Sequence, residues 1–248
     1  MKTQIKQKTI KLFGLFASVT LLLSIFAILQ SFLSFILLFA RLRKDDMASE
    51  MIFQFPNVVL NGEEFSIWNL PEFYISLIIA GIVMIAFSLG LIALILNKNP
   101  VNYLGFKKFR KSDYQWIAYS IIFIAVYGLI LYILDLDFSP EVAFQNNFQI
   151  FLALLGVGIY GPVFEEILFR GYMLTRLNEI LGSKKQFISI FIVSVFFAML
   201  HIYYPPQVWI LIFIMSVFLC VMKLKTGNLW LPVIFHVINN LLAVYLLI

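Results

Sequence analysis

Long apolar stretches, separated by short polar connections, dominate the sequence. A helix needs roughly 20 residues to cross the hydrocarbon core of a bilayer. The stretches predict seven transmembrane helices, at Leu12–Ala40, Phe73–Leu96, Trp116–Leu134, Phe148–Phe164, Phe187–Tyr204, Gln207–Met222 and Asn228–Ile248. The last four are close to that length or slightly short, so we expect some of them to be tilted, kinked or only partly spanning. The pattern therefore predicts an all-α integral membrane protein.

Two polar connections organise the predicted helices. The longest is Arg41–Glu72, and the acidic connection Asp135–Asn146 separates three N-terminal helices from four C-terminal ones. We expect residues 1–135 to hold helices 1–3, and residues 136–248 to form a four-helix catalytic core. All the candidate chemistry lies in the second part.

Composition and charge add an orientation. The chain is 62% hydrophobic and only 12% charged, which suits a protein whose main solvent is lipid. With the N-terminus inside, 15 of the 18 Lys and Arg residues fall on the inner side, and only Arg41, Arg43 and Lys44 fall outside. Positive charge favours the inner face, so we expect a cytoplasmic N-terminus and an external C-terminus. The Lys-, Ile- and Phe-rich usage favours a bacterial cell membrane, and basic residues scattered over short loops exclude nucleic acid as an expected partner.

Few polar groups interrupt the apolar helices, and a charge at the bilayer centre costs roughly 2.5–3.5 kcal/mol. Glu165 and Glu166 are adjacent, and Arg170 follows Glu166 at i+4, the favourable order for an ion pair. That pairing would leave Glu165 as an unpaired carboxylate, which suits a general base. The alternative is that both acids only mark the inner end of a span.

The two histidines of the chain both lie in this C-terminal part. His201 ends the segment Phe197–His201, and His236 shares a helix face with Asn240. Structural hydrogen bonding between packed helices is the alternative for each residue taken singly. Two imidazoles, an unpaired carboxylate and an amide are together the parts of a water-activating hydrolase.

Three motifs, spread over residues 140–248, resemble the CPBP family of intramembrane proteases, also called the CAAX prenyl protease 2, Abi or bacteriocin-processing family. The motifs are Glu165-Glu166-x-x-x-Arg170, Phe197-x-x-x-His201 and His236-x-x-x-Asn240. The resemblance implies that Glu165 and His201 activate the attacking water. It further implies that His236 and Asn240 stabilise the oxyanion, and that Glu166 and Arg170 support the site.

The resemblance also raises the question of a metal. If zinc is bound, Glu165, His201 and His236 would be its ligands, with water as the fourth. The sequence lacks the compact H-E-x-x-H spacing of a helical zinc site, and His236 with Asn240 suits hydrogen-bond donation better. We therefore favour a mechanism without a metal or other cofactor.

The sequence thus predicts an intramembrane endopeptidase acting on a membrane-associated peptide or protein, with the lipid bilayer as its other partner. One alternative is a non-catalytic membrane partner or bacteriocin immunity protein that retains the fold. A second is a small transporter with a proton relay, which an inverted repeat would support, and none is visible. For the candidate residues to converge, we expect the fourth helix to continue through Arg176, with a bend or close backbone approach at Gly156–Pro162. The oligomeric state is not predicted.

Overall fold

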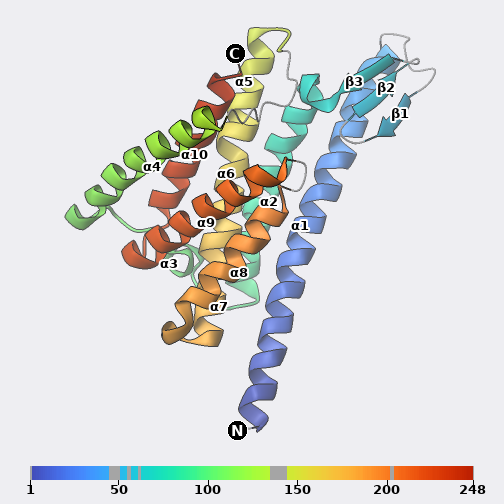
Figure 1. The fold of residues 1–248 in the computed structure, drawn as a ribbon. Helices are drawn as coiled ribbons and strands as arrows, with labels where there is room; N and C mark the ends of the chain where they lie inside the picture. The colour runs from blue at the N-terminus through green and yellow to red at the C-terminus, as the bar shows by residue number, and fades with distance from the viewer. Residues whose placement is uncertain are drawn as a thin grey trace. The chain divides into compact units, whose positions relative to one another are not determined.

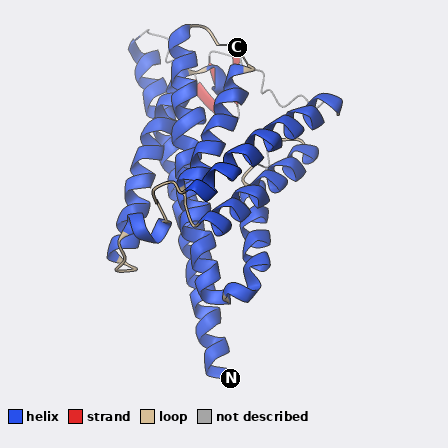
Figure 2. Ribbon diagram, turned by 90° about the vertical axis from the view of Figure 1, so that its left-hand side faces the viewer, coloured by secondary structure: helices blue, strands red, loops and turns tan. Residues whose placement is uncertain are grey.

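The computed structural model describes residues 2–44, 51–54, 57–60, 63–134, 144–201 and 204–247. The regular structure of these residues is helical apart from one small sheet (Figures 1 and 2). The helices are α1 (Lys2–Lys44), α2 (Pro71–Leu94), α3 (Pro100–Leu104), α4 (Tyr114–Ile133), α5 (Asn147–Leu155), α6 (Gly161–Glu166), α7 (Leu174–Leu181), α8 (Gln186–Met199), α9 (Pro206–Thr226) and α10 (Trp230–Tyr245). Short 3-10 turns precede α2, α4 and α8, at Ile67–Asn69, Lys111–Asp113 and Ser183–Lys185.

Within the described ranges, five helical segments are long and apolar enough to cross a membrane. They are Gln4–Arg43, Pro71–Leu94, Lys111–Ile133, Asn147–Leu181 and Pro206–Thr226, and α10 is a shorter apolar helix. The predicted class, a helical integral membrane protein, is confirmed. The count of seven spans stays a prediction, because α8 and α10 have only 14 and 16 residues. The predicted boundary between residues 135 and 136 lies outside the described residues.

A small antiparallel sheet occupies the polar connection after α1, where no strands were predicted. Its strands are β1 (Met51–Gln54), β2 (Asn57–Leu60) and β3 (Glu63–Ser66), in the order β1-β2-β3. Met51 lies opposite Leu60, and Asn57 lies opposite Ser66. The strands are four residues long, too short for a clear alternating pattern to be recognised in the sequence.

The chain divides into two compact units. The first comprises residues 1–22, 85–138 and 164–236, and the second comprises residues 23–84, 139–163 and 237–248. In the first unit, packed phenylalanine rings join α4, α9 and α10. Phe218 lies between Phe123, at 4.5 Å, and Phe235, at 5.3 Å between ring centroids. In Figure 1, α8 and α9 lie side by side in this unit.

In the second unit, small residues bring helices close together. The core there includes Leu38, Val58, Phe73 and Leu152. A Cβ placed on Gly156 would lie 3.3 Å from the carbonyl oxygen of Tyr74 on α2. A Cβ on Gly158 would lie 2.6 Å from Leu241 of α10. The predicted close approach at these glycines is confirmed.

The fourth apolar helix is longer than the uncharged stretch Phe148–Phe164 from which it was predicted. Helical structure continues from Asn147 to Leu181, through Arg176 as predicted. Two π-helical segments, Gly156–Tyr160 and Ile167–Met173, flank α6. Such insertions are rare and often occur at functional sites. The pair Glu165–Glu166 lies at the end of α6, between the two π-helical segments.

Candidate functional site

The centre of the candidate site is an ion pair within the first unit. Glu166, the last residue of α6, accepts a hydrogen bond of 2.7 Å from Nη1 of Arg170, and both side chains are fully buried. Arg170 lies in the π-helical segment that follows. The i,i+4 pairing predicted from the sequence is therefore present in the structure.

Arg170 is held by residues of α8 and α9. Its Nη2 donates to the hydroxyl of Ser216 on α9 at 2.8 Å. Its guanidinium lies over the ring of Phe197 on α8, 4.4 Å from the centroid. The carboxylate, the hydroxyl and the aromatic face together offset the cost of burying this cation. The role of Ser216 was not predicted from the sequence. Its position as a polar residue in the apolar stretch Gln207–Met222 was nevertheless a sign of a hydrogen bond between helices.

His236 of α10 links the two glutamates. Its Nδ1 lies 2.9 Å from Oε1 of Glu166, and its Nε2 lies 3.8 Å from Oε2 of Glu165. A carboxylate accepts hydrogen bonds, so the short contact to Glu166 assigns a hydrogen to Nδ1. The Nε2 atom is then the ring nitrogen that faces Glu165. Glu166 thus fixes the orientation of the imidazole, as outer-shell carboxylates commonly do for functional histidines.

The two glutamates differ in exposure. The side chain of Glu166 is fully buried, whereas that of Glu165 is 29% exposed. Glu165 makes no hydrogen bond among the described residues. Glu166 therefore has a structural role through its buried contacts. Glu165 is the carboxylate that is accessible to water or substrate. This division agrees with the sequence prediction.

His201 lies in the turn that follows α8, in contact with Phe197. Its Nδ1 is 2.9 Å from the carbonyl oxygen of Phe197, and the two rings are 5.1 Å apart. The same phenylalanine ring is 5.8 Å from His236, so it contacts both imidazoles. Within the described part of the chain, His201 has no hydrogen bond or ion pair with Glu165.

Tyr204 extends this cluster. Its ring stacks on His201 with centroids 6.1 Å apart. Tyr204 was not singled out in the sequence, because a tyrosine at the end of an apolar stretch also suits a membrane interface.

Asn240 belongs to the second unit, one helical turn beyond His236 on α10. Its side-chain amide donates to the carbonyl oxygen of Val157 at 3.1 Å. Val157 lies in the π-helical segment Gly156–Tyr160. The structure therefore brings Glu165, Glu166, Arg170 and His236 into one network in the first unit, while the described contacts of Asn240 are within the second.

In the described part of the chain, the candidate donors do not form a metal site. Among the described residues, no group of three His, Cys, Asp or Glu side chains is placed to hold a metal ion. The set Glu165, His201 and His236 therefore does not fit zinc in this arrangement. The expectation of a metal-independent site stays a prediction.

An apolar groove of about 560 Å³ adjoins the His201 turn. It lies between the end of α8 and the start of α9, and is lined by Val195, Ala198, Met199, Pro206, Trp209, Ile210 and Phe213. The carbonyl of Ala198 accepts a hydrogen bond from the backbone N–H of His201, at 3.0 Å. The groove thus begins one turn from the imidazole.

Comparison with known protein families bears on the C-terminal part of the chain. Residues 147–242 match the family model Rce1-like, described as type II CAAX prenyl endopeptidase Rce1-like. The matched range contains all the motif residues from Glu165 to Asn240, and it confirms the resemblance found in the sequence. No curated protein and no solved structure matches the chain.

Proposed function

Because residues 147–242 match the Rce1-like family of type II CAAX prenyl endopeptidases, we propose that this membrane protein is an intramembrane endopeptidase. It hydrolyses a peptide bond of a membrane-associated peptide or protein. The observation that carries the proposal is the buried chain Arg170–Glu166–His236, which presents Nε2 of His236 toward the partly exposed Glu165.

Glu165 acts as the general base in the proposed reaction. The gap of 3.8 Å between Glu165 and His236 is too long for a direct hydrogen bond and suits a bridging water. Glu165 accepts a proton from that water as its oxygen bonds to the carbonyl carbon of the substrate. Glu165 then returns the proton to the leaving nitrogen when the peptide bond breaks. His201 assists the activation of the water.

Hydrogen-bond donors stabilise the negative oxygen of the tetrahedral intermediate. His236 and Asn240 carry this role in the proposal. Since Nδ1–H of His236 donates to Glu166, the ring faces the substrate through Nε2, which donates to the oxyanion in the imidazolium form. The positive charge of Arg170 balances the negative charge of Glu166. The ion pair that holds His236 therefore carries no net charge.

The groove beside His201 favours a substrate that is apolar next to the cleaved bond. Its lining is almost entirely apolar, and it opens beside the turn that carries the imidazole. Apolar side chains or an attached lipid group next to the cleaved bond would lie there. Such a substrate would reach the site from the bilayer.

The deciding experiment compares Glu165→Gln with the wild type, using purified protein and candidate membrane peptides. Loss of a general base lowers the rate by about 10²–10⁴-fold. Mass spectrometry in heavy-oxygen water is expected to find the label in the new carboxylate of the wild-type product. Glu179→Gln, which changes a partly exposed carboxylate on α7, is the matched control and should cleave normally. Wild-type cleavage by Glu165→Gln would overturn the proposal.

A further inference from the structure

A second cluster of charged groups, separate from the histidine network, lies where α3 and α9 end. Both helices stop at a glycine in the left-handed region, Gly105 with φ of 80° and Gly227 with φ of 63°. A Cβ on Gly105 would lie 2.7 Å from the carbonyl oxygen of Gly227. The two helix ends therefore meet backbone to backbone, which only glycine allows.

Two ammonium groups flank this contact. Nζ of Lys223 donates to the carbonyl of Leu104 at 2.5 Å and rests against Gly105, although the residue is only 7% exposed. Nζ of Lys107 lies 3.2 Å from the position of a Cβ on Gly227. Two positive charges therefore lie against the same contact between Gly105 and Gly227. In the described part of the chain, neither lysine forms an ion pair.

No described acidic group nearby neutralises this pair. The buried Asp113 is paired with Arg110 at 3.2 Å, and Arg110 also donates to the carbonyl of Thr226. A helix C-terminus supplies roughly half a negative charge. α3 is only five residues long, so the two helix ends offset at most about one of the two charges. About one positive charge therefore remains at a half-buried position.

The cluster lies at the end of membrane-spanning segments. The α9 span ends at Thr226, and another span begins at Lys111. The ring of Trp230 packs against Phe106 with centroids 4.8 Å apart. Tryptophan at a span end marks the depth of the lipid headgroups. The uncompensated charge is therefore placed at the depth of phospholipid phosphates.

We propose that Lys107 and Lys223 bind the phosphodiester of an anionic lipid headgroup. A phosphodiester carries one negative charge, which matches the charge left uncompensated. Basic pockets between membrane helices recognise lipid headgroups in this way. The bound lipid would hold the α3–α4 linker on the turn between α9 and α10, where Leu229 N–H already donates to the Gly105 carbonyl at 2.8 Å. The proposal does not depend on the protease function, and its test needs no substrate.

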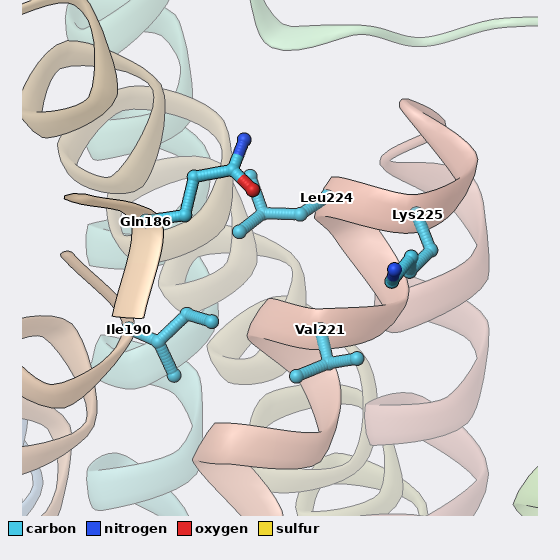
Figure 3. Close-up of a pocket in the computed structure, with 5 residues that line it drawn as sticks. All are labelled: Gln186, Ile190, Val221, Leu224 and Lys225. Atoms are coloured by element: carbon cyan, nitrogen blue, oxygen red, sulfur yellow. The ribbon is translucent and has the colours of Figure 1, made fainter. Parts of the chain in front are cut away.

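Lys225 provides a matched control on the same end of α9. It is exposed and lines a different pocket of about 300 Å³, together with Gln186, Ile190, Val221 and Leu224 (Figure 3). Lys225→Gln removes the same charge from the same helix end but leaves the Lys107–Lys223 pair intact. It therefore separates a specific site from general attraction to an anionic membrane.

The test uses the full-length protein in nanodiscs of phosphatidylcholine with increasing phosphatidylglycerol, and follows the melting temperature. In phosphatidylcholine alone, Lys107→Gln should melt at or above the wild type, because one of the two positive charges at this contact is removed. Phosphatidylglycerol should raise the melting temperature of the wild type. The variant should need roughly fivefold more of this lipid for half of the effect, as expected for one lost lysine contact. Lys107 is exposed, so the variant is expected to fold even if Lys223→Gln does not.

Three outcomes would overturn the proposal. The first is an equal response of Lys107→Gln and the wild type to phosphatidylglycerol. The second is an equal weakening in Lys225→Gln, which would indicate general electrostatics. The third is a wild-type response to inorganic phosphate, in phosphatidylcholine discs, as large as the response to the anionic lipid. That result would identify a soluble phosphate as the ligand.

Discussion

Arg170 is the most deeply constrained charged residue of the candidate site. Its guanidinium is fully buried and contacts Glu166, Ser216 and Phe197, each from a different helical segment. Removing one partner of a buried pair leaves an uncompensated charge, which costs about 3–5 kcal/mol. We therefore predict that Arg170→Met lowers the melting temperature by roughly 10 °C, measured by intrinsic fluorescence on heating.

Arg176 provides the comparison for this prediction. It pairs with Glu179 at the same distance of 2.7 Å, but both side chains are partly exposed. Arg176→Met should therefore cost less than about 1 kcal/mol. The double variant Glu166→Gln/Arg170→Met should regain part of the lost stability. Similar losses for Arg170→Met and Arg176→Met would show that burial does not decide the difference.

At the scale of helices, Gly171 sets how closely the segment after Arg170 packs. A Cβ there would lie 2.5 Å from Leu104 and 3.2 Å from Leu229, both fully buried. Overpacking of this kind costs about 1–3 kcal/mol. We predict that Gly171→Ala lowers the melting temperature. Gly128→Ala meets open space on α4, so it should be neutral or stabilise the helix by roughly 0.5–1 kcal/mol. The same loss in both variants would refute a packing effect.

The sequence predicted those helical features that depend on local spacing. The apolar stretches and the Glu166–Arg170 pair follow from periodicity along one helix, so they could be found without a structure. The contacts of Arg170 with Ser216 and of His236 with Glu166 join distant segments, whose partners are separated by 46 and 70 positions. No local pattern encodes them. The π-helical segments are also not visible in the sequence, because they change hydrogen bonding without changing the apolar composition.

At the scale of the whole molecule, the basic residues make a prediction about topology. The strong bias of Lys and Arg toward one side of the predicted spans favours an N-terminus and C-terminus on opposite faces, with the N-terminus cytoplasmic. A membrane-impermeant thiol reagent should therefore label an added C-terminal cysteine, but not an N-terminal one, on intact cells. The native Cys220 is fully buried and provides the unlabelled background. Labelling of both termini would require an even number of spans.

The division of labour between the two adjacent glutamates has a practical consequence. Glu166 anchors the arginine and the imidazole, whereas Glu165 supports no hydrogen bond among the described residues. Changing Glu165 to glutamine should therefore abolish peptide-bond hydrolysis while the protein stays folded. The inactive variant would still bind the substrates that the active protein cleaves. Expressed in the native host with an affinity handle, it could serve as bait to isolate the natural substrates.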